Sequence, residues 1–496
     1  MKKLVSLILS LVLVLSMGTF CVGAQADAEP IKLTWAMGTG DTAPIDNAMV
    51  LEELNKMSRE LIGVECDIQY FSGDQIQISV QSGEVFDIYF TCSWYNNFNQ
   101  GVSQGIFANI DGKVQEMAPD LYASMTEDVW NLAHSANGGL YAIPVKKDYA
   151  MMNFLTYPTE KAKELGFEIP DRISSWDEMT DFLVAWKGTM SDNEYPVLVG
   201  GNPAGLESSF DFIDRTAMLG CVFGTTKIVT QMDDPEIMER YRTMAKWYKL
   251  GLVNPDAAQL SGTSIDEKKQ RIDFVQAWPG YDFSVTNGYD TSMTCFFGPN
   301  LSSDSVQGSM NALSVTLEDD EERMAAALKY IELCHTNKQF NDTMRYGVEG
   351  YHWNYVTEDQ NPECAGAVLR TEIGNSNYNP WGFSQPAYFE ASIAVSQDQV
   401  DGKAKAPVLD QYDQYYDIIA SSANVSAISG FTWDSSNFTS NIAEVSAIKD
   451  EYYKDFATGT RAIDDVYQEF MDKLNAAGMQ EMIADAQSQL DAYLAR

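Results

Sequence analysis

Aromatic and hydrogen-bonding side chains recur in this sequence where predicted strands give way to loops. Because the carboxyl ends of strands in an open α/β sheet border a crevice, such loop residues are within reach of a ligand. Flat rings beside polar groups suit a sugar, which presents an apolar ring face and a rim of hydroxyls. The candidate ligand-binding residues are Asp41, Asp74, Trp94, Tyr95, Asn97, Trp278, Tyr281, Glu349, Trp353 and Trp381.

Several of these residues also have a structural interpretation. Asp41 precedes a predicted helix and suits a helix cap as well as a ligand contact. Trp94 follows a strand and has polar neighbours, which favours ligand binding over packing. Trp278, Glu349 and Trp353 suit either role. The tryptophans inside predicted strands or helices are expected in the core: Trp35, Trp130, Trp176, Trp186 and Trp247.

The sequence lacks the motifs of the common catalytic and metal-binding sites. Without G-x-S-x-G, H-E-x-x-H, GxxxxGK(S/T) or an EF-hand loop, it lacks the residues that esterases, zinc proteases, ATPases and calcium sensors require. It has only three histidines and no C-x-x-C pair, so neither a metal site nor a cofactor is expected. We expect a binding protein rather than an enzyme. A secreted glycoside hydrolase stays open as the alternative, because 71 acidic residues could supply its pair of carboxylates.

The charge and the cysteine content limit the partners and covalent links of the chain. It has 33 basic and 71 acidic residues, a net charge of −38, and no basic stripe, so nucleic acid is not expected as a partner. The six cysteines after Cys21 are widely scattered, and Cys295 and Cys334 lie in apolar runs. We expect these cysteines to be free and buried rather than paired.

The first 26 residues have the pattern of an export signal. Two lysines precede the apolar run 4–17, and small residues up to Ala26 offer a cleavage site. The run is shorter than the roughly 20 residues of a membrane-spanning helix. Cys21 lies where a bacterial lipoprotein is acylated, but Phe20 fills a position that normally needs a small residue. We therefore predict a cleaved signal peptide at 1–26 and a secreted protein, with a lipid anchor at Cys21 as the less favoured alternative.

Alternating strands and helices are expected to position the candidate residues. Strands are predicted at 31–37, 64–71 and 85–91, and an amphipathic helix at 42–62 that ends at Gly63. This β-α-β-α-β order predicts a largely parallel sheet covered on both faces. The 496 residues exceed the roughly 250 to 300 at which a single core stops growing, so two lobes are expected.

The pattern resumes in the second half of the chain. A strand is predicted at 151–155 and a helix at 159–165. A capping box at Ser175 and an Asp-Pro pair at Asp234 mark two helix starts. The last segment, 441–494, is predicted to be helical with breaks near two glycines, Gly459 and Gly478.

Five blocks of sequence, taken in order, resemble one protein family. They are SGEVFDIYFTCSW at 82–94, GLYAIP at 139–144, YKLGLVNPDA at 248–257, YGVEG at 346–350 and SGFTWD at 429–434. Together they resemble the extracellular solute-binding proteins of bacterial ABC importers, in particular the sugar-binding branch and its LipO-like subfamily. The chain departs from many Gram-positive members at Phe20, which precedes the cysteine at the usual lipidation position.

The resemblance implies an α/β, two-lobed, periplasmic-binding-protein-like fold of type II, with an interlobe cleft and a helical C-terminal region. One lobe is expected to comprise 27–147 and about 310–375, and the other 148–309 and about 376–496. Hinges are expected at 144–149 and 308–311.

The resemblance also implies how such a protein works. It captures a carbohydrate, here expected to be an oligosaccharide, by hinge closure, and it delivers this ligand as a monomer to the permease subunits of an ABC transporter. A neutral sugar is expected because the candidate loops have no evident basic clamp. Lys146 and Lys147, close to a predicted hinge, are nevertheless placed to meet an anion.

Overall fold

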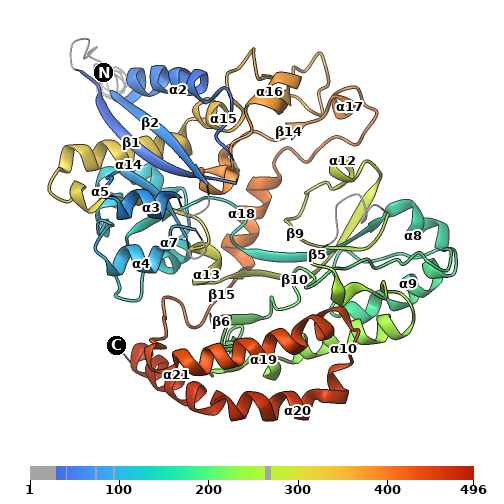
Figure 1. The fold of residues 1–496 in the computed structure, drawn as a ribbon. Helices are drawn as coiled ribbons and strands as arrows, with labels where there is room; N and C mark the ends of the chain where they lie inside the picture. Colours follow the sequence, from blue (N-terminus) through green and yellow to red (C-terminus); the bar gives the residue numbers. More distant parts are fainter. Residues whose placement is uncertain (1–28, 41, 73–74, 93–94, 263–269, 496) are drawn as a thin grey trace, which may run out of the picture.

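Two sheets lie at the centres of two lobes, and α18 (Gln411–Ser422) runs between the lobes in the middle of the view (Figure 1). The computed structural model describes residues 29–40, 42–72, 75–92, 95–262 and 270–495. The predicted signal peptide and the candidate residues Asp41, Asp74 and Trp94 lie outside the described residues. The two-lobed α/β architecture is the one that the sequence predicts.

The sheet of the first lobe has five strands. Their order is β2 (Val64–Ser72), β1 (Ile31–Thr39), β3 (Ile88–Thr91), β11 (Met310–Leu313) and β4 (Ala142–Pro144). β1 pairs in parallel with β2 and β3, as predicted, whereas β11 is antiparallel to β3 and β4. Trp35 and Met37 point into one core and Ala36 into another, so both faces of β1 are buried. This two-sided burial explains the nearly continuous apolar run of the strand.

The sheet of the second lobe has four strands and is mainly antiparallel. Their order is β15 (Asn424–Val425), β10 (Thr291–Leu301), β5 (Met151–Pro158) and β9 (Asp273–Gln276). β5 is antiparallel to both β10 and β9. Leu155 of β5 and Phe274 of β9 pack in a core with α10 (Pro235–Lys249). A smaller antiparallel sheet of β6 (Phe210–Asp214), β7 (Leu219–Val222) and β8 (Val229–Thr230) contributes to the same core.

The remaining elements cover the sheets or lie beside the gap between the lobes. The first-lobe helices are α2 (Asn47–Ile62), α3 (Gln75–Gln81), α4 (Phe98–Ser103), α5 (Lys113–Met117), α6 (Pro119–Ala123), α7 (Glu127–Ala133), α14 (Glu321–Thr336) and α15 (Lys338–Tyr346). α8 (Thr159–Leu165), α9 (Thr180–Lys187) and α12 (Ser284–Asn287) belong to the second lobe. A third small sheet of β12 (Trp353–Tyr355), β13 (Val368–Arg370) and β14 (Ala394–Val395) lies near α16 (Glu372–Asn377) and α17 (Gln397–Val400).

Three helices close the chain as a layer on the outer side of the second lobe (Figure 1): α19 (Thr439–Thr458), α20 (Ile463–Ala476) and α21 (Met479–Leu494). The breaks fall at Gly459 and Gly478, as predicted, and both glycines have left-handed backbone conformations. A Cβ at Gly459 would lie 2.2 Å from the Met244 carbonyl oxygen of α10. Glycine is therefore required for the close approach of α19 to α10.

Other local predictions are confirmed. α8 ends at Gly166, and the Asp234 side chain accepts a hydrogen bond from Glu236 N at 2.8 Å at the start of α10. The capping box at Ser175 forms, although a short 3₁₀ turn precedes α9. The six cysteines in the described part are all buried, and no two of them are joined by a disulfide bond. Among the described residues, no helix is long and apolar enough to span a membrane.

The chain passes between the two large sheets at 145–150 and at 302–309. β4 leaves the first sheet at Pro144 and β5 enters the second at Met151, while β10 and β11 bound the second crossing, which contains α13 (Ser303–Val306). The predicted hinge segments lie at these crossings. α18 holds the first crossing: the Tyr415 hydroxyl accepts from Ala150 N at 2.8 Å and donates to Ala150 O at 2.9 Å.

The segment 376–392 packs on the first lobe, although the predicted boundary at about 376 assigns it to the second. Ser384 Oγ donates to the Gly38 carbonyl of β1 at 2.9 Å, and Asn311 Nδ2 of β11 donates to Ser384 O at 3.2 Å. These contacts favour a lobe boundary later in the chain than about 376, and the exact division into lobes stays a prediction. The segment has no helical or strand periodicity that could have indicated which sheet it joins.

Candidate ligand-binding cleft

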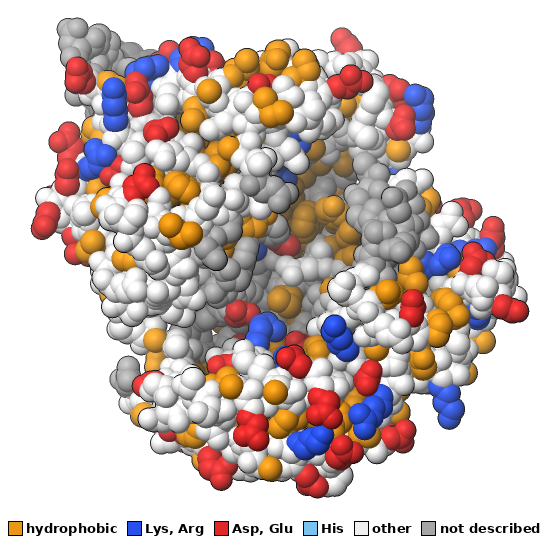
Figure 2. Space-filling view, viewed as in Figure 1, with side chains coloured by type: hydrophobic (Ala, Val, Ile, Leu, Met, Phe, Trp, Pro, Cys, Tyr) orange, Lys and Arg blue, Asp and Glu red, His pale blue; other side chains and the backbone are white. Residues whose placement is uncertain are grey.

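A cavity of about 880 Å³ lies between residues that follow β9 and residues of the small sheet beside the first lobe. We call it the Trp278 cavity. Trp278, Tyr281 and Asp282 line one side, and Arg345, Arg370 and Tyr388 are among the residues opposite. The surface is visibly hollowed between the two lobes, and hydrophobic side chains lie inside the hollow (Figure 2).

Aromatic rings form one wall of the Trp278 cavity. The Trp278 ring centroid lies 4.7 Å from that of Tyr281 and 4.7 Å from that of Phe389, both in edge-to-face geometry. Phe389 stacks on Tyr412 at 4.1 Å. The Trp278 indole N–H donates to Gln411 Oε1 of α18 at 2.7 Å, which fixes the orientation of the ring. Such a wall offers a sugar ring a rigid apolar surface at a low cost in side-chain entropy.

A second cavity of about 630 Å³, the Trp381 cavity, shares a wall with the first. Arg345, Tyr346, Arg370, Tyr388 and Ala394 line both. Thr39 and Gly40, at the carboxyl end of β1, lie on the far side, where the strand-end rule places a ligand. Trp381 itself rests against Phe90 at 5.8 Å and Tyr95 at 6.0 Å, centroid to centroid. The two cavities adjoin at these shared residues, and we call them together the chamber.

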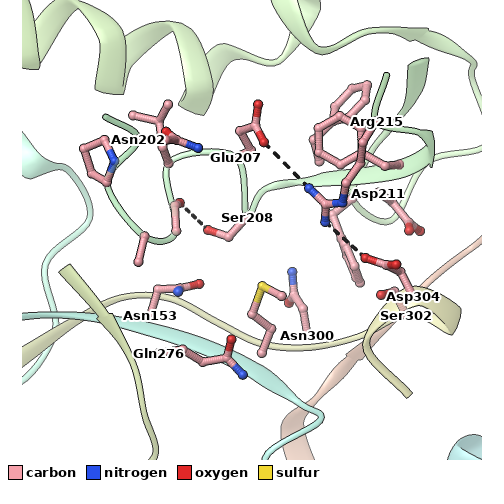
Figure 3. Close-up of a pocket in the computed structure, with 18 residues that line it drawn as sticks. Asn153, Asn202, Glu207, Ser208, Asp211, Arg215, Gln276, Asn300, Ser302 and Asp304 are labelled. Carbon is pink, nitrogen blue, oxygen red and sulfur yellow. Dashed lines mark hydrogen bonds and ion pairs between the residues drawn. The ribbon is translucent and has the colours of Figure 1, made fainter. Parts of the chain in front are cut away.

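A third cavity of about 240 Å³ lies in the second lobe, between its sheet and the loop before β6 (Figure 3). Asn153, Gln276 and Asn300 rise from three neighbouring strands, and Glu207 and Asp211 face them. Asn153 is almost fully buried, yet its Oδ1 has no hydrogen-bond partner among the described residues. Glu207 Oε1 is likewise unpartnered there. Buried polar atoms usually have partners, so this Asn153 cavity offers groups that a polar ligand can satisfy.

Charge is unevenly distributed around the Asn153 cavity. Arg215 forms ion pairs with Asp304 at 3.1 Å and with Glu207 at 3.6 Å (Figure 3). Asp211 is outside this network, and burial raises the pKa of its carboxyl to about 6. The nearby charge of Asp304 raises this pKa further, whereas a hydrogen bond from Ser426 opposes the shift. Asp211 therefore changes its charge in a pH range where ordinary aspartates are already ionised.

The structure brings together three of the predicted site residues: Trp278, Tyr281 and Trp381 all line the chamber. Tyr95 lies next to it, but its ring is buried against Phe90 and Trp381. Asn97 caps α4 and accepts from Gln100 N at 2.9 Å. A capping side chain follows a strand as readily as a ligand-binding one does, so sequence position does not separate these roles.

Two predicted residues lie elsewhere. Trp353 is fully buried, its indole N–H donates to Gly347 O at 2.6 Å, and it does not line the chamber. Glu349 is exposed and lines a different cavity, beside Gln339 of α15. The neighbouring His352 is buried and hydrogen-bonded: its Nδ1 accepts from Val348 N at 2.9 Å.

No pattern in the sequence indicates the two arginines of the chamber or the polar residues of the Asn153 cavity. Arg345 is on the last turn of α15 and Arg370 ends β13, about 25 residues apart in sequence, so no local cluster of charge marks them. Lys146, the predicted anion contact, instead forms an ion pair with Glu390. In the described part of the chain, no three His, Cys, Asp or Glu side chains are grouped as metal ligands.

One protein that is named as a substrate-binding protein matches nearly the whole chain. A carbohydrate ABC transporter substrate-binding protein of Streptococcus pneumoniae serotype 4 is 22% identical over 474 residues, which cover 90% of this chain and 88% of that protein. Residues 427–495 match the family model of a domain of unknown function, DUF3502. The resemblance to solute-binding proteins is thereby confirmed, while the LipO-like subfamily stays a prediction.

Solved structures share the fold. The crystal structure of the N-glycan transport solute-binding protein NgtS from Streptococcus pneumoniae has a TM-score of 0.78 at 20% identity, covering 94% of this chain and 99% of that one. The complex of NgtS with Man5GlcNAc has a TM-score of 0.64 at 21% identity, covering 94% and 98%. An extracellular solute-binding protein from Bifidobacterium longum subsp. infantis has a TM-score of 0.58 at 14% identity, covering 94% and 98%. These likenesses confirm the two-lobed fold with its helical C-terminal region.

Proposed function

We propose that this protein is the extracellular solute-binding component of an ABC importer and that it captures an oligosaccharide between its two lobes. The observation that carries the proposal is the chamber lined by Trp278, Tyr281 and Trp381. It joins an aromatic wall to hydrogen-bonding side chains, and residues of both lobes bound it. The relative from S. pneumoniae, named as a carbohydrate substrate-binding protein, supports the same function.

The size of the chamber favours an oligosaccharide over a single sugar. The Trp278 and Trp381 cavities have volumes of about 880 and 630 Å³, and each is within the range of roughly 300 to 1,000 Å³ that holds a small-molecule ligand. Because they share five lining residues, one extended ligand can occupy both. The Asn153 cavity supplies polar groups from the second lobe that such a ligand can reach on closure.

Closure requires that the ligand interact more strongly with the closed state than with the open one. We propose that the crossings 145–150 and 302–309 act as hinges, with 27–147 and 310–400 as one lobe and most of the remainder as the other.

We propose that the protein is a receptor rather than an enzyme. It acts outside the cell as a monomer and delivers its ligand to permease subunits. A signal peptide at 1–26 is part of this proposal, with a lipid anchor at Cys21 as the less favoured alternative. If the protein were instead a glycoside hydrolase, Asp211 would be the obvious general acid, because burial raises its pKa to about 6.

Binding and turnover can be separated in one experiment. The purified protein is incubated with a pool of plant and host oligosaccharides, and bound saccharides are recovered and identified by mass spectrometry. We expect intact oligosaccharides, a rise in melting temperature, and a smaller radius of gyration by X-ray scattering on closure. Steady release of cleaved sugars that Asp211→Asn abolishes would instead establish a hydrolase.

Matched variants locate the site. Tyr281→Ala removes a partly exposed ring of the chamber, and we expect at least a tenfold loss of affinity with an unchanged fold. Tyr351→Ala removes an exposed ring that lines neither cavity and serves as the control. Equal affinities of the two variants would show that the ligand binds elsewhere.

A further inference from the structure

Two arginines occupy the wall that the Trp278 and Trp381 cavities share. Arg345 lies one residue before the end of α15, and Arg370 is the last residue of β13. Both line both cavities, and both are partly buried. The Tyr346 ring is near both, with its centroid 5.3 Å from the Arg345 guanidinium carbon and 6.0 Å from that of Arg370. The two cations thus line the same chamber beside one aromatic ring.

Arg345 is held by neutral groups. Its Nη1 donates to the Tyr388 carbonyl at 2.6 Å, and its guanidinium lies 3.4 Å from the centroid of the Tyr388 ring. These contacts fix the plane of the guanidinium and engage one of its N–H groups. An arginine has five N–H donors, so others are directed away from Tyr388 and can bind a ligand.

Arg370 is held in the same manner. Its Nη2 donates to the carbonyls of Gly374 and Tyr378, and its Nη1 donates to Asn379 Oδ1 at 3.2 Å. Its Nε is buried and has no hydrogen-bond partner among the described residues. Burial lowers the pKa of the Arg370 guanidinium, and the charge of Arg345 lowers it further. The site therefore brings two positive charges close together without neutralising them.

Carboxylates neutralise most other arginines of this acidic chain. Of the described arginines, only Arg172, Arg345 and Arg370 form no ion pair with another described residue. Asp282 and Glu372 also line the Trp278 cavity, but neither lies within 4.0 Å of either guanidinium as an ion pair. Bringing two like charges together in a partly buried wall costs free energy unless an anion compensates them.

We propose that the ligand of this chamber is an acidic oligosaccharide and that Arg345 and Arg370 bind the anionic group of one of its sugar units. The inference rests on the proposed function and narrows its ligand class. The planar guanidinium matches the oxygens of a carboxylate or a sulfate in bidentate geometry. The aromatic wall at Trp278 then contacts the neighbouring sugar rings, so that charge and ring faces are recognised in adjoining parts of one chamber.

The first experiment measures which class of saccharide the protein binds when several classes compete. Equal amounts of neutral oligosaccharides, uronate-containing oligosaccharides, sialyl-oligosaccharides and sulfated disaccharides are pooled, and the bound fraction is identified by mass spectrometry. We expect acidic saccharides to be enriched at least tenfold, and the enriched class identifies the anionic group as carboxylate or sulfate. A bound fraction that consists of neutral saccharides would overturn the inference and leave the receptor function intact. A protein that binds no saccharide would overturn the proposed function itself.

The second experiment tests the two arginines. Galacturonate oligomers are compared with their neutral methyl esters by calorimetry, or the enriched saccharide is compared with its carboxyl-reduced or desulfated form. We expect at least tenfold tighter binding of the charged form, and weaker binding of that form as salt increases. Arg345→Met and Arg370→Met should remove this preference while the neutral form still binds, and Arg370→Lys should restore only part of it.

Arg59→Met is the matched control, because Arg59 is exposed on the first lobe and pairs with Glu65. We expect its preference for the charged form to be unchanged. Equal loss of charged and neutral ligand in both chamber variants would assign the arginines to hydroxyl binding or to folding, and would refute the inference. If either variant misfolds, the salt dependence of binding to the unmodified protein tests the inference instead. If salt weakens the binding of the charged and the neutral ligand equally, the inference is refuted.

Discussion

Replacing Asp211 with asparagine tests the electrostatics of the Asn153 cavity. Asp211 is 7% exposed, and its pKa is about 6 in the folded chain against 3.8 for an ordinary aspartate. Below pH 3.8 the carboxyl is protonated in both the folded and the unfolded chain, so burial carries no charge penalty. Above pH 6 it is ionised in both, and the folded state bears the full penalty of a buried charge.

The size of the penalty follows from the two pKa values. At roughly 1.4 kcal/mol per pKa unit, their difference corresponds to about 3 kcal/mol of lost stability above pH 6. The stability of the unmodified protein should therefore fall as the pH rises from about 4 to about 6. Asp211→Asn keeps an acceptor for the Ser426 hydroxyl but has no charge, so it should avoid this loss.

Scanning calorimetry at pH 4 and pH 8 measures the effect. At pH 8 we expect Asp211→Asn to raise the melting temperature of the second lobe by about 6 to 12 °C, from roughly 2 to 4 °C per kcal/mol for a lobe of this size. At pH 4 the gain in stability should be below about 1 kcal/mol. Asp359→Asn, at an exposed position, is the control and should change neither value. A variant that is no more stable at pH 8, or equally stabilised at both pH values, would refute the reasoning.

Three further perturbations test other parts of the structure. Tyr415→Phe leaves both backbone groups of Ala150 without their α18 partner and should cost about 1 to 3 kcal/mol by calorimetry; an unchanged melting temperature would contradict this. Gly382→Ala puts a Cβ 2.1 Å from the Tyr388 ring, so the ring must move and saccharide affinity should fall at least fivefold in fluorescence titrations; unchanged affinity would exclude Tyr388 from the site. Arg323→Ala removes bonds of 2.6 and 2.8 Å to the buried Asp87 and should destabilise the first lobe by about 2 to 4 kcal/mol, less than for a fully buried pair. Adding Asp87→Asn to that variant should recover part of the melting temperature, and a further loss would show that Asp87 is not left as an unpaired charge.

The elements with strong local signals could be predicted from the sequence. β1 is apolar because both of its faces are buried, and α8 and α19 end at glycines in the left-handed conformation. Asp234 caps α10 through its own side chain. These features depend on a few neighbouring residues, so one sequence is sufficient to reveal them.

The site could be predicted only in part, because it depends on contacts between distant segments. Trp278 and Tyr281 were found because they follow a strand and are close together in sequence. Arg345 and Arg370 were missed because each looks like a solvated charge at the end of its own element, and only the fold brings them to one wall. Trp353 is buried, and its sequence signal does not reveal this, because a buried and a cleft tryptophan have the same signal when both follow a turn.

The position of α18 constrains how the lobes can move. Two flexible segments of chain that join two rigid lobes define an axis, and the lobes can rotate about this axis with little resistance. Within the described residues α18 adds a third connection, which is a helix of 12 residues rather than a flexible segment. Because Tyr415 fastens it to Ala150 in the first crossing, rotation about the other two connections must tilt this helix as a lever. Gln411 and Tyr412 at its first turn line the chamber, so the same tilt would move two ligand-facing side chains together with the lobes.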